Sequence, residues 1–154
     1  MPRSGMMGCL TIMQDTRGRR SSMRLQRRSL RCSKSDLRPL IRDADLCHLS
    51  ERPDGVHWDG IESFDRKRGR GAVYAFRGTT ADEADHVFRL QGVLPNRWYR
   101  VRFHDGTSVD RTIDGRELLR GGIPVHLPQP NSSELILFEE TGSGAGGALP
   151  GGVE

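Results

Sequence analysis

The chain has 154 residues with 24 basic and 20 acidic side chains, so its formal net charge at pH 7 is +4. This length allows one domain of ordinary size and excludes a large enzyme barrel, which takes about 250 residues. Hydrophobic residues make up only 34% of the chain, which suggests a core confined to part of it, and no apolar run approaches the roughly 18 residues that span a bilayer.

Residues 1–35 form a basic segment rich in arginine and serine, with nine basic residues against one acidic residue. The segment has no sustained helical or strand periodicity, so we expect it to be disordered. Three interpretations are open. The segment is out-of-frame translation of GC-rich DNA, a basic arm that binds nucleic acid through its phosphates, or an arginine-rich targeting presequence.

The three cysteines, Cys9, Cys32 and Cys47, all precede the region that we expect to fold, and no two of them have the spacing of a zinc knuckle. His48 follows Cys47, but adjacent ligands need partners elsewhere, and no nearby segment supplies a second Cys/His pair. We therefore predict no disulfide framework, no metal site and no cofactor.

The first predicted elements lie between residues 36 and 64. Residues 36–50 are predicted to be a connector or a short helix, because leucine and isoleucine recur at helical spacing and Pro39 is tolerated only in a first helical turn. Pro53 and Gly55 then predict a turn. A strand should follow over residues 56–64, interrupted by Asp59-Gly60.

Two further strands are predicted before residue 92. Residues 65–71 form a charged connection punctuated by glycine, and Ala72–Phe76 is the most apolar strand candidate, so it should lie centrally in a sheet. After a polar loop over residues 79–85, alternation over residues 86–90 predicts another strand.

The clearest alternation runs over Arg97–His104 and predicts a half-buried antiparallel strand. One face of this strand carries Tyr99, Val101 and Phe103, and the other carries Trp98, Arg100, Arg102 and His104. Asp105-Gly106 is a favoured hairpin turn, so the return strand should run over Thr107–Ile113.

The last predicted elements are a short helix and two strands. Asp114 should cap the helix, with Glu117 reaching back and Gly121 ending the helix in a left-handed conformation. Two prolines make residues 123–127 an extended edge segment, and residues 134–139 are apolar on both faces, as in a buried closing strand. We assign Tyr74, Phe76, Tyr99, Phe103 and Phe138 to the core, and Trp58 to the core or its rim.

Together these elements predict an all-β fold, namely a small antiparallel β-sandwich with one short helix over residues 51–140. A small β-barrel is the alternative architecture. Residues 141–154 contain six glycines and few apolar side chains, so we expect a flexible tail.

Several segments in this order resemble the C-terminal portion of bacterial glycoside hydrolases of the alpha-galactosidase (melibiase) type, families 36 and 27. The resemblance covers roughly residues 36–140, and no single motif in it is specific. Its segments are Asp36–Leu46, Arg52–Ile61, Gly71–Arg77, Phe88–Pro95, Trp98–Val101, Gly115–Val125 and Leu127–Ile136.

The resemblance implies an antiparallel β-sandwich that follows a catalytic barrel. Members of that family hydrolyse alpha-galactosides with two carboxylates on the barrel, upstream of this region, and nothing in this chain can form a barrel. His57-Trp58-Asp59 is superficially similar to a barrel-strand motif, but it follows a turn at the start of the sandwich. We therefore predict no catalytic residue, and whether the chain belongs to an enzyme depends on its missing barrel.

The candidate site residues are Trp98, Arg100 and Arg102, because an aromatic side chain on the polar face of a strand is unusual. Trp98 can contact another domain, stack on a sugar ring, or cover the stems of its arginine neighbours. The first hypothesis is a non-catalytic accessory domain, a fragment that normally packs on a glycoside hydrolase barrel in cis or in trans. The alternatives are a free-standing carbohydrate-binding module and a nucleic-acid-binding protein acting through residues 1–35. We expect a cytoplasmic protein without a membrane partner.

Overall fold

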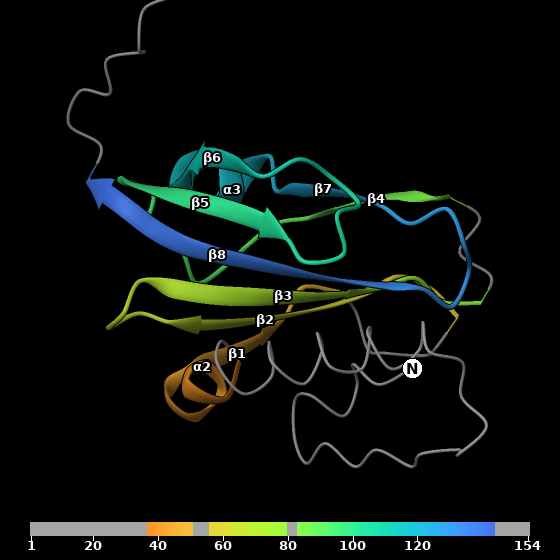
Figure 1. The fold of residues 1–154 in the computed structure, drawn as a ribbon, viewed down its shortest axis with the longest axis horizontal. Helices are drawn as coiled ribbons and strands as arrows, with labels where there is room; N and C mark the ends of the chain where they lie inside the picture. Colours follow the sequence, from red (N-terminus) through yellow and green to blue (C-terminus); the bar gives the residue numbers. More distant parts are fainter. Residues whose placement is uncertain (1–36, 51–55, 80–82, 144–154) are drawn as a thin grey trace, which may run out of the picture.

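The computed structural model describes residues 37–50, 56–79 and 83–143, which form antiparallel strands in two sheets with two short helices (Figure 1). The predicted all-β fold is therefore confirmed. The predictions for residues 1–35, for the turn at residues 52–55 and for tail residues 144–154 lie outside the described residues.

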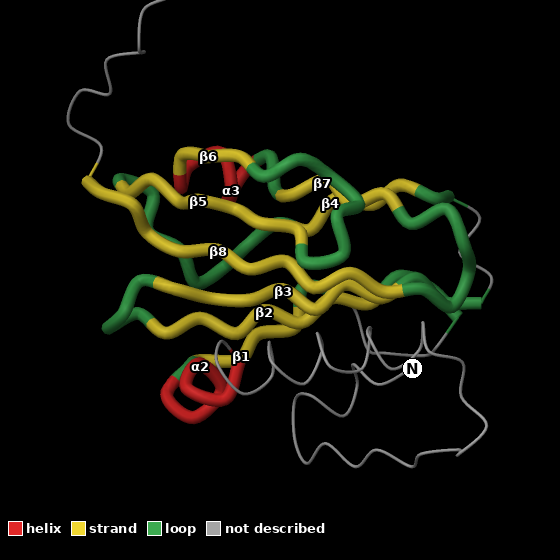
Figure 2. The backbone as a smooth tube through the Cα atoms, viewed as in Figure 1, coloured by secondary structure: helices red, strands yellow, loops and turns green. Residues whose placement is uncertain are grey.

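The larger sheet has the strand order β1-β2-β3-β8-β5-β6, and every neighbouring pair is antiparallel. Its strands are β1 (Asp45–His48), β2 (Asp59–Asp65), β3 (Arg70–Phe76), β5 (Arg97–Phe103), β6 (Arg111–Asp114) and β8 (Ser133–Ser143). Strand β3, which the sequence places at the centre, is central, and it pairs with β8, the predicted closing strand, which is also central (Figure 2).

A second layer covers one face of the large sheet. It consists of the two-stranded sheet of β4 (Asp85–Phe88) and β7 (Ile123–His126) together with helix α3 (Gly115–Arg120). Phe88, Leu118 and Val125 from this layer form one buried cluster with Tyr99 and Phe138 of the large sheet. We call this covered side of the large sheet the inner face.

The opposite face of the large sheet, which we call the outer face, is partly covered by helix α2 (Arg38–Asp43). Leu37, just before the helix, and Leu40 within it form a second buried cluster that includes Ile61, Tyr74 and Leu135. Ile61, Tyr74 and Leu135 belong to β2, β3 and β8, respectively. The outward side chains of β5 are therefore left exposed beside α2.

The structure adds one strand to the predicted connector and moves the start of another. Asp45–His48 forms β1 at the edge of the large sheet, where four residues carry too little periodicity to predict a strand. Asp59-Gly60 begins β2 instead of interrupting it. Gly60 is required there because a Cβ atom would lie 2.3 Å from the Phe88 ring, so the glycine lets the second layer approach the sheet.

The predicted return of the chain after β5 is present, because the Gly106 amide donates to the Phe103 carbonyl at 3.1 Å and β5 pairs with β6 in antiparallel orientation. The return strand is shorter than predicted, because β6 begins only at Arg111 and residues 104–110 form a loop. The His104 amide donates to the carbonyl of Leu135 in β8, and two other backbone amides at this end of β5 donate to carboxylates. The amide of Asp105 donates to Glu134 at 2.9 Å, and the amide of Phe103 donates to Asp110 at 3.1 Å. These side chains supply the partners that a hairpin ladder would have supplied.

The predicted short helix is confirmed as α3, with Asp114 capping it by accepting a hydrogen bond from the Arg116 amide at 2.7 Å. The left-handed residue, however, is Gly122 with a φ of 77°, whereas Gly121 has a φ of −83°. The described strand β8 also continues through Ser143, so residues 141–143 belong to a strand and not to the predicted tail.

An ionic network ties the end of α2 to the β2–β3 turn. A guanidinium nitrogen of Arg68 lies 2.7 Å from a carboxylate oxygen of Asp43 and 2.6 Å from one of Asp65. The hydrogen bond from Arg68 lowers the pKa of Asp65, which also accepts hydrogen bonds from the amides of Lys67 and Arg68. The Asp65 side chain is only 1% exposed, so its charge depends on these partners.

We expect Arg68→Ala to lower Tm at pH 7, with a loss that shrinks as the pH falls below about 4. A carboxylate with a lowered pKa in the folded state stabilises the protein above its unfolded pKa, and that contribution disappears as it becomes protonated. Thermal unfolding at several pH values measures the effect, with Lys67→Ala as the control in the same turn. An unchanged Tm difference down to pH 2 would show that Arg68 acts through packing instead of charge.

Candidate interaction face on strand β5

The three predicted site residues lie together on the outer face of β5. The strand alternates as predicted, with Tyr99, Val101 and Phe103 buried and Trp98, Arg100 and Arg102 exposed. Because successive side chains of a strand point to opposite faces, the three exposed side chains form one row on the outer face. We call this row the Trp98 strip.

Trp98 is the exposed aromatic side chain of this strip, with 37% of its surface accessible. Its neighbour on β8 is Gly142, which has no side chain, and a Cβ atom there would have no other atom within 4 Å. Its neighbour on β6 is Asp114. A bulge between Trp98 and Tyr99 shifts the register with β8 at this point. Among the described residues, no side chain of β8 therefore stands directly opposite the indole.

The two arginines of the strip have different neighbours on β8. Arg100 lies opposite Glu139, and Arg102 lies opposite Leu137. Directly opposed side chains have Cβ atoms about 4.5–5.5 Å apart, so the strip combines an aromatic, two cationic, one acidic and one aliphatic side chain within a small area. Aromatic side chains and arginine are enriched in protein interfaces, whereas glutamate is depleted.

Trp58 lies away from this strip, at the rim of the core as predicted. It is partly buried, and its ring stacks on His86 with the centroids 5.2 Å apart. Its indole nitrogen donates to the carbonyl of Glu83 at 3.1 Å. Burial of His86 beside this ring lowers the pKa of the imidazole. The stack fastens β4 to the segment before β2.

Two buried glutamates could be mistaken for a catalytic pair, but the backbone occupies both carboxylates. Glu62 accepts hydrogen bonds from the amides of Gln91 at 2.7 Å and Gly92 at 3.0 Å. Burial raises the pKa of Glu62, while the two amide hydrogen bonds act in the opposite direction. Glu134 accepts from Asp105 and Thr107 and from its own neighbour Leu135. Each carboxylate therefore fastens a loop to the sheet.

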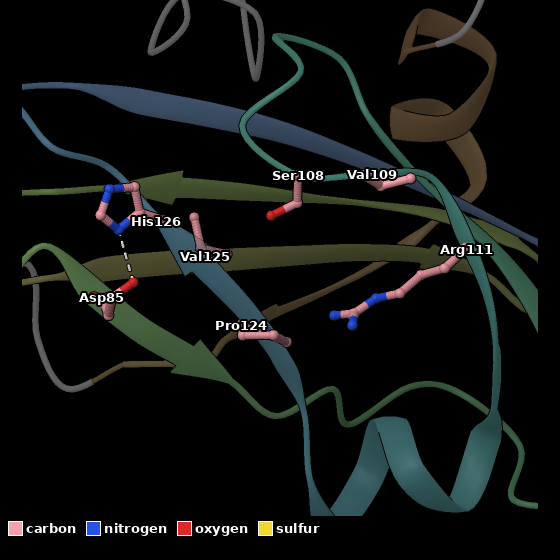
Figure 3. A pocket seen from close by; sticks show the side chains of 7 residues that line it. All are labelled: Asp85, Ser108, Val109, Arg111, Pro124, Val125 and His126. Atoms are coloured by element: carbon pink, nitrogen blue, oxygen red, sulfur yellow. Dashed lines mark hydrogen bonds and ion pairs between the residues drawn. The ribbon is translucent and has the colours of Figure 1, made fainter.

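Sequence reasoning missed a pocket beside the second layer. It has a volume of about 360 Å³ and lies between β4, β7, the loop 104–110 and β6 (Figure 3). Its polar side chains are Asp85, Ser108, Arg111 and His126. These residues come from four separate segments, so no motif or spacing in the sequence could have connected them.

The arrangement of the described residues bears on metal binding and on membrane association. Among them, no group of three or more His, Cys, Asp or Glu side chains is arranged to hold a metal ion. Within the same ranges, no helix has the length and hydropathy needed to cross a bilayer.

Comparison with solved structures finds alpha-galactosidases. The alpha-galactosidase from Lactobacillus brevis matches 96% of this chain with a TM-score of 0.74 and 14% identity, over 20% of its own length. The galactosidase domain of the alpha-galactosidase-sucrose kinase AgaSK matches 80% of this chain with a TM-score of 0.67 and 20% identity. The GH36 alpha-galactosidase AgaB from Geobacillus stearothermophilus matches 82% with a TM-score of 0.63 and 21% identity.

Both of the last two matches cover 17% of the longer chains, so this chain spans about a fifth or less of the structures it resembles. No protein-family model and no curated protein matches the chain. The sequence resemblance to alpha-galactosidases therefore agrees with the structural one, and the chain has the fold of a small portion of GH36 alpha-galactosidases.

Proposed function

We propose that the chain is the non-catalytic C-terminal accessory domain of an alpha-galactosidase-like glycoside hydrolase, and that it packs on a catalytic barrel in cis or in trans. The observation that carries the proposal is the difference in coverage. Solved alpha-galactosidases match 80–96% of this chain with only 17–20% of their own length, so most of each enzyme lies outside the matched part.

The chemistry of the described residues supports a role without hydrolysis. Retaining glycosidases need two carboxyl groups about 5–5.5 Å apart that can reach the scissile bond. Glu62 and Glu134 are 1% and 0% exposed, and backbone amides occupy their oxygens. A substrate cannot reach either carboxylate without unfolding the loop that it holds.

The proposal is tested with the full chain and the Lactobacillus brevis alpha-galactosidase from which the matching segment has been deleted. We expect the two chains to co-elute in size-exclusion chromatography, and we expect this chain alone to release no nitrophenol from nitrophenyl alpha-galactoside. Hydrolysis by the chain alone would contradict the non-catalytic role. Failure to co-elute with the truncated enzyme would contradict packing on a barrel.

Within this proposal the Trp98 strip is the contact surface, so Trp98→Ala should weaken the association by about tenfold or more. The loss is expected because a large aromatic side chain at the centre of an interface buries much apolar surface. The matched control is Leu94→Ala, since Leu94 is 38% exposed but lies in the loop before β5. Titration calorimetry and far-UV circular dichroism measure binding and folding. An equal loss of binding affinity in the two variants would show that the contact surface is not centred on Trp98.

A second candidate function is a free-standing carbohydrate-binding module, favoured by the open face of Trp98 beside Gly142. An exposed indole can stack on a sugar ring. This function predicts that the full chain is retained on a galactoside matrix and that Trp98→Ala abolishes retention with the fold intact. Passage of the unmodified chain through the matrix without delay would exclude it.

A further inference from the structure

The pocket beside the second layer has a size and lining that suit a small ligand. Its volume of about 360 Å³ falls within the range of about 300–1,000 Å³ that small-molecule sites occupy. Pro124 of β7 and Val109 of the loop are the exposed apolar residues of the lining, whereas the side chain of Val125 is buried in the core. A ligand can therefore place hydrocarbon against Pro124 and Val109 and polar groups toward the remaining side chains.

Arg111 supplies the cationic group of the pocket. Its guanidinium extends from β6 along Pro124 into the space between the loop and β7 (Figure 3). Among the described residues it has no hydrogen bond and no ion pair. The hydroxyl of Ser108 points into the same space and is likewise unpaired within the described ranges. The pocket therefore contains the N–H donors of the planar Arg111 guanidinium and the adjacent hydroxyl donor of Ser108.

The acidic side chain of the pocket is already engaged. The Asp85 carboxylate lies 2.8 Å from the Nδ1 atom of His126, and the two residues face each other across the β4–β7 pair. This contact directs the carboxylate to the imidazole and away from Arg111 (Figure 3). The positive charge of Arg111 is therefore not neutralised by the acidic group that lines the same pocket.

We propose that this pocket binds the carboxylate of a small organic acid, with Arg111 donating two hydrogen bonds to its oxygens and Ser108 donating a third. A guanidinium presents two parallel N–H groups that match the two oxygens of a carboxylate. Hydrogen bonds of this charged, bidentate kind are stronger than those between neutral groups. The carbon skeleton of the acid lies against Pro124 and Val109. The site is separate from the Trp98 strip, and its occupation does not depend on a catalytic barrel.

The test compares glucuronate with glucose, which differ only in the carboxylate at C6, in titrations of the full ¹⁵N-labelled chain followed by two-dimensional NMR. We expect glucuronate to shift the amide resonances of Ser108, Arg111 and Val125 in a saturable way. Glucose should shift them at least about tenfold more weakly, because it lacks the charged oxygens that pair with Arg111. Equal binding of both sugars, or no saturable shift with glucuronate, would overturn the proposal.

Two variants assign the effect to the pocket. Arg111→Gln keeps a polar exposed side chain, so the fold should persist, and it should weaken glucuronate binding by about tenfold or more. Arg100→Gln removes an exposed arginine from the outer face and should leave binding unchanged. Equal effects of the two variants would show nonspecific charge attraction and overturn the site. Tighter binding of glucose 6-phosphate than of glucuronate would overturn the assignment to carboxylates.

Discussion

Replacing Gly115 with alanine is expected to lower the free energy of unfolding by about 3 kcal/mol, at the upper end of the cost of overpacking. A Cβ atom at this position would lie 2.0 Å from the carbonyl oxygen of Leu94 and 3.2 Å from that of Arg97. Both are backbone atoms, so no side-chain rotation relieves the clash. Gly115 begins α3, so the helix would have to move away from the segment that leads into β5.

The matched control is Gly142→Ala, because a Cβ atom at Gly142 meets nothing within 4 Å. This change should be neutral or stabilising by a few tenths of a kcal/mol, since alanine restricts the unfolded chain. Urea unfolding followed by tryptophan fluorescence gives both free energies. A similar small effect of the two substitutions would mean that Gly115 is not in close contact with Leu94.

Glu134→Ala should also destabilise the protein by about 3 kcal/mol, because it leaves one buried and two partly buried backbone donors without their partner. The Glu134 side chain is fully buried and accepts hydrogen bonds from the amides of Asp105, Thr107 and Leu135. Hydrogen exchange at Asp105 and Thr107 should accelerate more than exchange in β3, since the loop 104–110 loses its attachment to β8.

Two further substitutions separate this role from a general effect of removing charge. Glu139→Ala removes a carboxylate from the outer face of the same strand and should cost less than about 0.5 kcal/mol. Glu134→Gln keeps one acceptor oxygen, so its loss in the free energy of unfolding should lie between those of Glu139→Ala and Glu134→Ala. If Glu139→Ala and Glu134→Ala destabilised the protein equally, the loop would not depend on Glu134.

The strands with the strongest local pattern were predictable from the sequence. In β5, strict alternation of buried and exposed side chains determines both the strand and its inner face, so the Trp98 strip followed directly. In β8, apolar residues at consecutive positions predicted burial on both faces, which its central position explains. Both patterns depend only on neighbouring residues in the sequence, so each one predicts which faces of its own strand are buried.

Other features depend on contacts between distant segments and had no local signal. β1 has only four residues, and its pairing with β2 determines that it is extended. The loop 104–110 contains a favoured hairpin dipeptide, yet Glu134 from a later strand binds its amides. The pocket required β4 to pair with β7, which are separated by two strands and a helix in the chain. Its residues could be grouped only once that pairing was seen.

The central place of β8 has a consequence for how the domain is made. β8 is the last strand of the described residues, and among their strands it alone joins the β1-β2-β3 half of the large sheet to the β5-β6 half. During synthesis, the facing edges of β3 and β5 remain unpaired until residues beyond 133 leave the ribosome. Exposed strand edges of this kind favour pairing with other chains. A nascent chain stalled before β8 should therefore aggregate, and the emergence of β8 from the ribosome is the step at which the two halves become one sheet.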